Sequence, residues 1–552
     1  MQPALALITA LIFVFSMAAC IGSGGENDAG QPDGTEVDAA DPGPDSGSDS
    51  GSDPGSDFGS DPGSDIGNDP GSDPGADLGG DLFQPCEPGI LPSQNILAET
   101  EMLIVTSTLM RNAFEVLADW KRSKGVATQV VTLDWIDQNI SGLDQAERVR
   151  NHIRTLHDNY NLGYVLLGGD ADVVPYRLVH SKALLTYDDQ FASDFYFSDL
   201  QGSWDDDGDG NYGEPGDGLD MHPDLAVGRL PVTFTSEAQN IVSRLLAYEQ
   251  TQPGCVKDAL FISEDTGFLN FDSAVQLNPL ADDIFPSGFN KQKLYWKHEN
   301  YADAEPNTHA AQVTALNSCR SFVTHYGHAS EYDLNMEMTA DQVADLTNSP
   351  DFPIYISCGC QAGNFPFESQ DSAAENLFST PSGGALAYLG NTNIGLGPGG
   401  GTALIESFYK GLFEEGLQKI GDALNFARDD FYQNENNLHS ELFGIRWTQL
   451  VVVLFADPEM PVFTDNPGVL SVEAPIAIAR EEQCVEVWVT LDGQPIEQAR
   501  VTLYRPGDFI YTLTSDESGL AVFRFAPDQA GDIHVTATYR NGLPGMGTII
   551  VP

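Results

Sequence analysis

Two short apolar runs in the middle of the chain each end beside a residue that can take part in acyl transfer. Residues 321–326 read Ser-Phe-Val-Thr-His-Tyr and lead to His328, and residues 352–357 read Phe-Pro-Ile-Tyr-Ile-Ser and lead to Cys360. Runs of this kind that stop at a polar, Gly-containing turn are typical of buried strands in a parallel sheet. Neighbouring strand ends lie only about 5 Å apart. The two runs therefore predict a thiol beside an imidazole, which is the nucleophile–base pair of a covalent acyl-transfer enzyme.

Other interpretations of the same residues stay open. A single cysteine near a strand is usually a small core residue, and single histidines such as His309 and His325 are usually structural. Cys358 and Cys360 lie two positions apart and face the same side of an extended strand, which would also suit a metal or redox pair, although strained geometry disfavours a Cys-x-Cys disulfide. A zinc hydrolase using His325, His328 and the cysteines is a further alternative, but no conventional zinc-ligand spacing occurs.

The two motifs also resemble a known family. Gly-His-Ala-Ser-Glu, beginning at Gly327, and Ser-Cys-Gly-Cys-Gln-Ala-Gly-Asn-Phe, beginning at Ser357, resemble the gingipain family of caspase-like cysteine peptidases. In that family the base lies in a Gly-His-Gly-Ser element and the nucleophile in a Cys-x-x-Gly-x-Phe element. The resemblance spans roughly residues 103–464. It includes further blocks at 118–121, 169–175 and 228–231.

This register implies a role for each site residue. Cys360, rather than Cys358, is the nucleophile, because glycine and phenylalanine follow it at the family's offsets. His328 is the base that withdraws the thiol proton and later protonates the leaving amine. The backbone N–H groups of Ala329 and Cys360 are the expected oxyanion donors. Ala329 departs from the family's glycine, so activity would be lower if a left-handed backbone were needed there.

Three aspartates are candidates for supporting roles. Asp170 and Asp172 follow a predicted strand, and either could orient His328 through its second ring nitrogen; the alternative is a turn or cap role. Family members known for activity cleave after Arg or Lys, which implies an acid in the S1 pocket. Asp194 is the candidate for that acid.

An acidic segment resembles the first half of a calcium loop. Residues 205–210 follow the pattern D-x-D-x-D-G, in which the glycine permits a sharp turn. The usual glutamate at the twelfth position is absent, because Gly216 stands there, and Glu214 or Asp217 could complete the shell. The predicted calcium ligands are Asp205, Asp207, Asp209, Asn211 and Glu214. The alternative is a solvated acidic turn.

Composition limits the remaining function classes. A chain of 552 residues suggests two to four domains. A formal net charge of −57 excludes nucleic acid as a partner, because phosphate binding needs a basic patch. Seven cysteines are too few for a disulfide framework. With Cys20 lipidated and Cys360 catalytic, five cysteines remain: Cys86, Cys255, Cys319, Cys358 and Cys484. Because five is an odd number, any disulfide pairing among them leaves at least one free thiol.

The amino-terminal part predicts export and tethering. Residues 4–19 are almost wholly apolar, and with Cys20 they close in Ser-Met-Ala-Ala-Cys, which fits a signal peptide. Met-Ala-Ala-Cys resembles a bacterial lipobox, which implies a lipid on Cys20 and an outer-membrane or cell-surface site; an ordinary secretory signal, with release outside the cell, is the alternative. The Gly, Ser, Asp and Pro residues that follow predict a disordered acidic spacer with a reach of about 45 Å.

The pattern of runs predicts an α/β fold: a caspase-like, doubly wound and mainly parallel sheet in two subdomains, followed by an immunoglobulin-like β-sandwich. The expected segments are a signal peptide (1–20), a linker (21–90), a first α/β subdomain with the calcium loop (91–252), a catalytic subdomain (253–466) and a sandwich (467–552). We expect a surface-tethered cysteine endopeptidase acting on proteins or peptides, without an organic cofactor. The alternative is a catalytically silent calcium-binding adhesion lipoprotein.

Overall fold

The computed structural model describes residues 100–184, 186–266, 272–367, 370–434 and 444–552. The predicted signal peptide, Cys20, and the acidic linker at 21–90 lie outside these residues. Within the described ranges, no helix is both long and apolar enough to cross a membrane.

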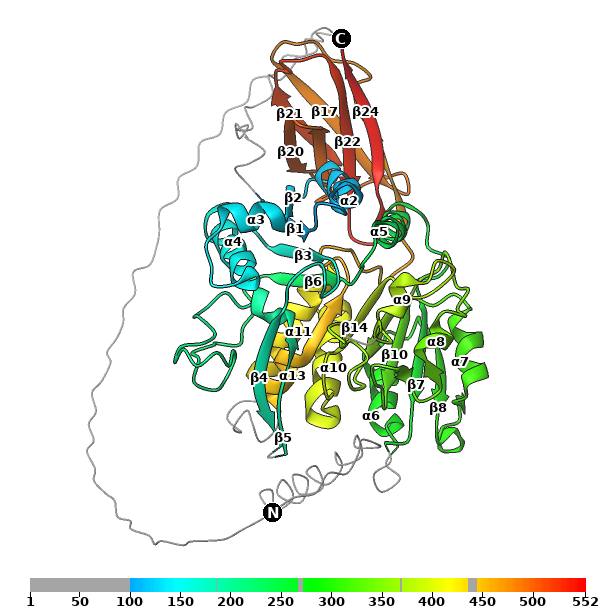
Figure 1. The fold of residues 1–552 in the computed structure, drawn as a ribbon. Coiled ribbons are helices and arrows are strands. Elements are labelled where there is room, and N and C mark those ends of the chain that lie inside the picture. The colour runs from blue at the N-terminus through cyan, green and yellow to red at the C-terminus, as the bar shows by residue number, and fades with distance from the viewer. Residues whose placement is uncertain (1–99, 185, 267–271, 368–369, 435–443) are drawn as a thin grey trace, which may run out of the picture. The chain divides into compact units, whose positions relative to one another are not determined.

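One eleven-stranded sheet forms the centre of the α/β region (Figure 1). In spatial order its strands are β2 (Thr128–Thr132), β1 (Met102–Thr106), β3 (Tyr164–Gly168), β6 (Ala226–Leu230), β15 (Val452–Phe455), β14 (Ala387–Asn391), β13 (Ile354–Ser357), β10 (Phe322–Tyr326), β7 (Asp258–Ser263), β8 (Asn290–Tyr295) and β9 (Ala304–Pro306). The central strands β1, β6 and β10 are buried along their whole length, as expected for parallel strands covered on both faces.

The sheet consists of two parallel halves that run in opposite directions. Every neighbouring pair is parallel except β14 and β15, which pair antiparallel. The carboxyl ends of β2, β1, β3, β6 and β15 therefore lie at one edge of the sheet, and those of β14, β13, β10, β7, β8 and β9 lie at the opposite edge. The mainly parallel α/β sheet is confirmed. Its halves do not follow the chain order, since β15 comes from the second predicted subdomain and completes the first half.

Helices cover the sheet, and their sequences explain where they form. In α2 the buried residues Phe114, Leu117 and Ala118 recur at helical spacing, and Asp144 caps α4 by accepting the Glu147 N–H. The helices are α2 (Arg111–Ser123), α3 (Leu133–Asn139), α4 (Gln145–Tyr160), α5 (Thr235–Gln250), α6 (Ala274–Pro279), α7 (His309–Leu316), α8 (Ala340–Val343), α9 (Asn376–Ser379), α10 (Thr402–Phe413), α11 (Ile420–Asn434) and α13 (Ile445–Val451).

Smaller elements lie in the connections. The 3-10 helices are η2 (Asp194–Phe197) and η4 (His298–Asn300), and the π-helical turns are η3 (Leu280–Ile284) and η5 (Gly397–Gly401). Two hairpins pair β4 (Arg177–Ala183) with β5 (Tyr187–Ser193), and β11 (Asp333–Asn335) with β12 (Met338–Thr339).

The carboxyl-terminal part forms two sheets with their own apolar core, which confirms the predicted β-sandwich (Figure 1). One sheet has the order β18-β17-β16-β23 with β21 paired to β17, and the other has the order β20-β19-β22-β24. The strands are β16 (Gly468–Glu473), β17 (Gln483–Leu491), β18 (Gln494–Pro495), β19 (Arg500–Arg505), β20 (Phe509–Thr514), β21 (Leu520–Phe525), β22 (Gly531–Thr538), β23 (Gly542–Leu543) and β24 (Gly545–Val551).

More of the cysteines form disulfides than the composition suggested. Cys255 and Cys319 form a disulfide that joins the segments entering β7 and β10, and Cys484 is disulfide-bonded as well. Cys358 and Cys360 are free thiols and are both buried. The expectation that at least one cysteine besides Cys360 stays outside a disulfide is therefore confirmed by Cys358.

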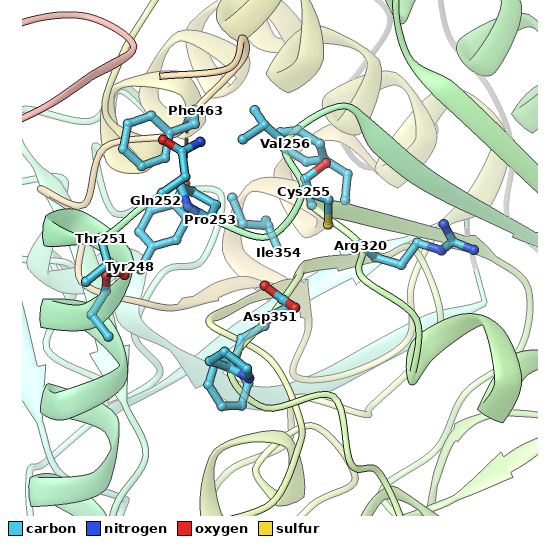
Figure 2. Close-up of a pocket in the computed structure, with 15 residues that line it drawn as sticks. Tyr248, Thr251, Gln252, Pro253, Cys255, Val256, Arg320, Asp351, Ile354 and Phe463 are labelled. Carbon is cyan, nitrogen blue, oxygen red and sulfur yellow. Dashed lines mark hydrogen bonds between the residues drawn. The ribbon is translucent and has the colours of Figure 1, made fainter. Parts of the chain in front are cut away.

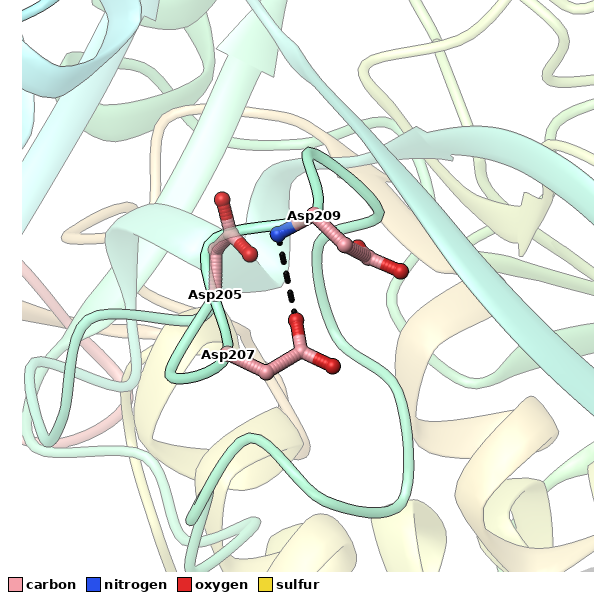
Figure 3. A group of neighbouring side chains, drawn as sticks. All are labelled: Asp205, Asp207 and Asp209. Atoms are coloured by element: carbon pink, nitrogen blue, oxygen red, sulfur yellow. Dashed lines mark hydrogen bonds between the residues drawn. The ribbon is translucent and has the colours of Figure 1, made fainter.

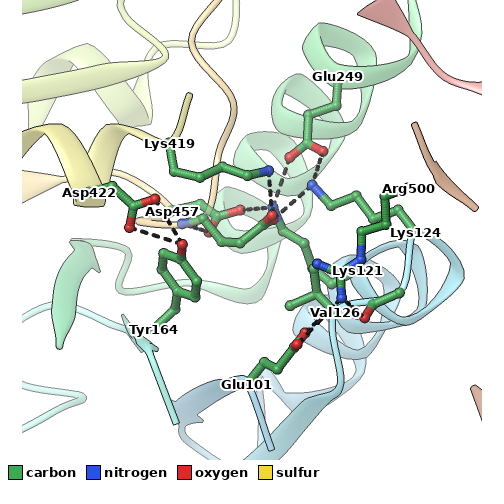
Figure 4. Close-up of polar contacts among 12 residues, drawn as sticks. Glu101, Lys121, Lys124, Val126, Tyr164, Glu249, Lys419, Asp422, Asp457 and Arg500 are labelled. Carbon is green, nitrogen blue, oxygen red and sulfur yellow. Dashed lines mark hydrogen bonds and ion pairs between the residues drawn. The ribbon is translucent and has the colours of Figure 1, made fainter. Parts of the chain in front are cut away.

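A buried ionic cluster fastens α2 and α5 to the segment after β15 (Figure 4). The Nζ of Lys121, from α2, lies 2.8 Å from Glu249 of α5, 2.5 Å from Asp457 and 2.7 Å from Glu459. Lys124 and Lys419 add two further cations. Three positive and three negative side chains thus neutralise one another.

Candidate active site

Strand register brings the predicted nucleophile and base loops together. β10 and β13 are parallel neighbours in which His325 is paired with Ser357, and the Cys358 N–H donates to the His325 carbonyl at 3.1 Å. His328 and Cys360 each follow their register-paired residue by three positions. Both therefore leave the same edge of the sheet on adjacent strand tips, as the sequence predicted.

The two loops also touch, at Ala329 and Gly359. A Cβ built on Gly359 would lie 2.6 Å from the Ala329 Cβ, so only glycine fits opposite this methyl group. Ala329 is not among the residues with positive φ. The cost anticipated for alanine at this position is therefore absent, because its backbone is not left-handed and the missing Cβ of Gly359 makes room for its methyl group.

Cys360 is buried beside the loop that follows β14. Its side chain is buried, and its Sγ lies 4.0 Å from the Gly395 carbonyl oxygen. The preceding carbonyl, of Gly359, accepts from Asn391 Nδ2 at 2.8 Å. The following residue, Gln361, donates its N–H to the Asn393 carbonyl at 2.9 Å. The loop after β14 therefore forms one wall of the cysteine's surroundings.

Glu264 is a site residue that the sequence reasoning missed. It follows β7, is almost fully buried, and its Oε2 accepts the backbone N–H of His328 at 2.9 Å while Oε1 accepts that of Met336 at 2.9 Å. A Cβ on Gly327 would lie 2.3 Å from Glu264 Oε2, so this glycine permits the approach. The signal was available, because Glu264 stands at the polar end of an apolar strand, as His328 and Cys360 do.

His325 lies beneath the site and is fully buried. Its Nδ1 hydrogen-bonds Ser357 Oγ at 2.9 Å, its Nε2 lies 3.4 Å from Glu264, and the same Ser357 Oγ accepts the Gly359 N–H. In the described part of the chain, the groups whose ligand atoms converge within 4.8 Å contain carboxylates only. Nothing in this arrangement supports the alternative of a zinc site made from histidines and cysteines.

The prediction that Asp170 or Asp172 orients His328 is wrong, because the sheet reverses between them. Both aspartates follow β3 in the first half, at the edge opposite to His328, and four strands separate β3 from β10. Asp170 instead hydrogen-bonds the buried side chain of Glu375. Burial, together with the Asp170 carboxylate, raises the pKa of Glu375 well above its usual value.

Asp194 is not an S1 acid, since its charge is neutralised by Arg229. Arg229 Nε lies 2.7 Å from Asp194 Oδ2, and Arg229 Nη2 lies 2.8 Å from Oδ1. The aspartate side chain is only 7% exposed, and the arginine also donates to the Gly169 carbonyl at the carboxyl end of β3. Through these contacts the buried pair stabilises the loop after β3, and the Arg229 guanidinium also lies 4.4 Å from the ring of Phe365, five residues after Cys360.

The predicted calcium loop brings three of its five candidate ligands together (Figure 3). Carboxylate oxygens of Asp205, Asp207 and Asp209 lie within 4.8 Å of one another. The Asp209 N–H donates to Asp207 at 3.1 Å, and the Gly210 N–H donates to Asp205. The backbone of the loop thus holds the three carboxylates in a cluster, an arrangement that suits a hard divalent cation.

The two other candidate ligands make different contacts. Asn211 accepts from Gln190 Nε2 at 3.0 Å and donates to Asp209. Glu214 hydrogen-bonds His180 Nδ1, while Asp188 bonds the other ring nitrogen. Burial alone would lower the pKa of His180, but hydrogen bonds to these two carboxylates outweigh it and raise that pKa. Glu214 is therefore paired with a histidine instead of facing the three aspartates.

A small hollow lies away from the candidate site (Figure 2). Its cavity volume is about 70 Å³, and it is lined near the start of β10 and β13 by Tyr248, Pro253, Cys255, Arg320 and Ile354, among others. Sites for small molecules usually measure about 300–1,000 Å³. Its size and its place at the amino ends of these strands exclude it as the substrate site.

The fold of this chain is shared with solved structures of cysteine proteinases. The structure is similar to that of the Arg-specific cysteine proteinase gingipain R, RgpB, with a TM-score of 0.66 at 19% identity, covering 82% of this chain and 98% of that one. It is also similar to the complex of pro- and mature domains of RgpB from Porphyromonas gingivalis, with a TM-score of 0.64 at 18% identity, covering 82% and 100% of the two chains.

The chain belongs to peptidase family C25, whose model matches residues 96–463. It is therefore a cysteine-type peptidase. Gingipain R2 of Porphyromonas gingivalis is 22% identical over 458 residues, which cover 79% of this chain and 55% of that protein. A protein of Archaeoglobus fulgidus of undescribed function is 23% identical over 336 residues, covering 53% and 75%. The chain thus spans about half the length of gingipain R2.

Proposed function

We propose that this protein is a surface-tethered endopeptidase that hydrolyses peptide bonds with Cys360 as nucleophile and His328 as base. The observation that supports the proposal most directly is the β10–β13 register, in which both residues follow paired positions by three residues. The contact between Ala329 and Gly359 further supports it, because it brings the loop of His328 against the loop of Cys360.

In the proposed reaction, His328 takes the proton of the Cys360 thiol, and the thiolate sulfur attacks the carbonyl carbon of the substrate. The oxyanion accepts hydrogen bonds from the N–H groups of Ala329 and Cys360. The Ala329 N–H donates to no acceptor among the described residues, which suits this role. His328 then protonates the departing amine as the C–N bond breaks. Water hydrolyses the thioester, which releases the acid and restores the thiol.

A preference for Arg or Lys before the cleaved bond is part of the proposal. It rests on similarity to a structure described as Arg-specific and on the formal net charge of −57, which attracts basic substrates. The acid that would receive the basic side chain is left unassigned, since Asp194 is neutralised by Arg229.

A substrate-library profile of the purified protein tests this function. We expect cleavage after basic residues, complete loss in Cys360→Ala, and little change in the matched variant Cys358→Ala, which removes the other free thiol. A peptidyl chloromethylketone should alkylate Cys360, and His328→Ala should slow this alkylation by about 10²-fold or more, within the usual range for a general base. Cleavage that persists in Cys360→Ala would refute the assignment; absence of both cleavage and enhanced alkylation in the wild type would favour the silent adhesion protein.

We also propose that Asp205, Asp207 and Asp209 hold a calcium ion, with backbone carbonyls and water completing the six to eight oxygen ligands that calcium takes. Three clustered carboxylates repel one another, and a divalent cation removes this repulsion. The ion would be structural, because the loop lies outside the contacts described for Cys360.

Calcium should stabilise the protein measurably. At a free concentration about a hundredfold above its Kd, the ion should raise the free energy of unfolding by about 2.7 kcal/mol, and a chelator should remove that gain. Asp207→Asn should abolish the response, whereas Asp158→Asn, a change at a carboxylate whose side chain is 61% exposed, should preserve it. An equal melting temperature with and without calcium in the wild type would contradict the proposal.

Export and lipid attachment at Cys20 complete the proposed function. The apolar run at 4–19 and the Met-Ala-Ala-Cys sequence support them, and the acidic linker at 21–90 would hold the enzyme away from the membrane surface. We expect labelled fatty acid to be incorporated into the wild-type protein and not into Cys20→Ser.

A further inference from the structure

A carboxylate on the base loop holds the nucleophile loop. Glu331 lies three residues after His328, and its Oε1 accepts from Gln361 Nε2 at 2.9 Å and from Asn364 Nδ2 at 3.2 Å. Both amides belong to the loop that begins at Cys360. One side chain therefore connects the segment carrying the proposed base to the segment carrying the proposed nucleophile.

The residue directly after Cys360 has a strained backbone. Gln361 has φ +56°, which lies in the left-handed region that residues other than glycine rarely adopt. Such a conformation persists only where its surroundings impose it. Beyond this residue the loop is anchored, because the Gly363 N–H donates to the Asn391 carbonyl at 3.0 Å. The φ angle of Gln361 therefore sets the position of Cys360 relative to a fixed loop.

Three hydrogen bonds hold Gln361 in that conformation: its N–H donates to the Asn393 carbonyl, its carbonyl accepts the Asn364 N–H at 3.0 Å, and its side-chain amide donates to Glu331. The first two use the backbone of Gln361 and survive any change at position 331. The third depends on the Glu331 carboxylate alone, which is half-buried and pairs with no cation in the described part of the chain.

The backbone of Glu331 is held separately from its side chain. Its carbonyl accepts the Ala373 N–H at 2.8 Å, and the next residue, Ala374, donates its N–H to the Ala362 carbonyl at 2.9 Å. Removing the carboxylate thus leaves the two loops joined through residues 373 and 374. A variant at Glu331 consequently tests the side-chain contact, and not the integrity of the whole site.

We propose that Glu331 is a positioning residue for the nucleophile: by accepting from Gln361 and Asn364, it stabilises the left-handed backbone that places the Cys360 sulfur for attack. This inference rests on the proposed function of Cys360. It assigns to Glu331 an effect on catalysis that acts through Gln361 and requires an acceptor oxygen, whereas a negative charge is not required.

Glu331→Ala should lower kcat by about 10- to 100-fold, since a displacement of about 1 Å at reacting groups costs up to about 10² in rate, with KM changed less than about threefold. Glu331→Gln should stay within about threefold of wild type, because its amide oxygen can accept from the same two donors. Glu299→Ala, which removes a carboxylate whose side chain is 66% exposed, serves as the matched control and should not change kcat.

A double-mutant cycle that combines Glu331→Ala with Gln361→Gly tests whether Glu331 positions the nucleophile or has only a general structural role. Glycine adopts positive φ without strain, so the Glu331→Ala change should lower kcat less than about threefold in the Gln361→Gly background. The rate of Cys360 alkylation, followed by mass spectrometry over a range of pH, should show the same dependence without requiring a peptide substrate.

The outcomes distinguish the two proposals. If wild-type Cys360 shows neither cleavage nor enhanced alkylation, the function itself fails. If the wild type is active but Glu331→Ala lowers kcat equally in both backgrounds, or has no effect, the positioning role fails and the function stands. A loss in Glu331→Gln equal to that in Glu331→Ala, with raised KM, would show that Glu331 acts through its charge on the substrate, which also overturns the inference.

Discussion

Glu264→Ala is expected to lower kcat/KM by about 10²-fold or more, because it removes the support of the base loop. The carboxylate accepts the N–H groups of His328 and Met336, and each buried donor left without an acceptor costs about 1–3 kcal/mol. The His328 backbone would then shift toward an alternative acceptor, and a displacement of about 1 Å in a reacting group costs about 10² in rate. Steady-state kinetics on a basic peptide substrate measures the effect.

Glu264→Gln provides the graded control. Its single oxygen can replace one acceptor, while its NH2 group faces the other donor, so its activity should fall between those of the wild type and Glu264→Ala. Circular dichroism at the assay temperature shows whether each variant remains folded. Undiminished activity in folded Glu264→Ala would mean that the two hydrogen bonds do not position His328.

Lys121→Met should lower the free energy of unfolding by about 3–5 kcal/mol, the usual cost of breaking a buried ion pair on one side only. Lys121 is fully buried and contacts three carboxylates (Figure 4). Without it, Lys124 and Lys419 leave one buried negative charge unbalanced. Urea unfolding followed by circular dichroism gives the free energy. Lys182→Met, at a lysine whose side chain is 48% exposed, should change it by less than about 0.5 kcal/mol.

The pH dependence of this cluster follows from two opposite shifts. Burial would lower the pKa of Lys121, but Asp457, Glu249 and Glu459 outweigh it and raise that pKa well above its usual value. Its contribution is therefore complete below the unfolded pKa and is lost only as pH rises through the folded pKa. Burial would raise the pKa of Glu459, yet Lys121 and two further lysines hold it well below its usual value. That contribution is lost as pH falls, so Lys121→Met should reduce stability throughout the neutral range.

The local signals of the sequence were sufficient to predict that the loops carrying His328 and Cys360 leave adjacent strands at one edge of the sheet. Strands β10 and β13 are short apolar runs that end at Gly-containing turns, and parallel neighbours place such ends at one edge. Glu264 obeys the same rule at the end of β7 but lies in no motif, so only the structure drew attention to it. The Gly359–Ala329 contact was also out of reach, because it joins two loops that no local pattern connects.

Strand direction was the main feature that could not be predicted. The residues of β15, Val-Val-Leu-Phe, form a continuous apolar run like any buried strand, and such a run carries no information on whether its neighbour is parallel. The prediction that Asp170 and Asp172 lie near His328 assumed that all strands of the sheet end at the same edge. The antiparallel pairing of β14 with β15 places the two halves in opposite directions, so this assumption does not hold. Asp194 failed for a different reason: Arg229 lies within the buried strand β6, and an arginine there requires a partner.

Because β14 and β15 pair antiparallel, the crossovers of the first half of the sheet lie beside the candidate site, whereas its proposed reacting residues follow strands of the second half. A crossover between parallel strands must return the chain to the edge from which both strands start, and for the first half of the sheet that is the edge where Cys360 lies. The β3–β6 connection accordingly carries β5 past the loop after β14, where Asp189 accepts from Asn393 Nδ2 at 3.0 Å and the Ala192 carbonyl accepts from Thr392 at 2.7 Å. Insertions in such crossovers can reshape the surroundings of the proposed nucleophile during evolution, while β10 and β13, the strands that lead to His328 and Cys360, stay unchanged.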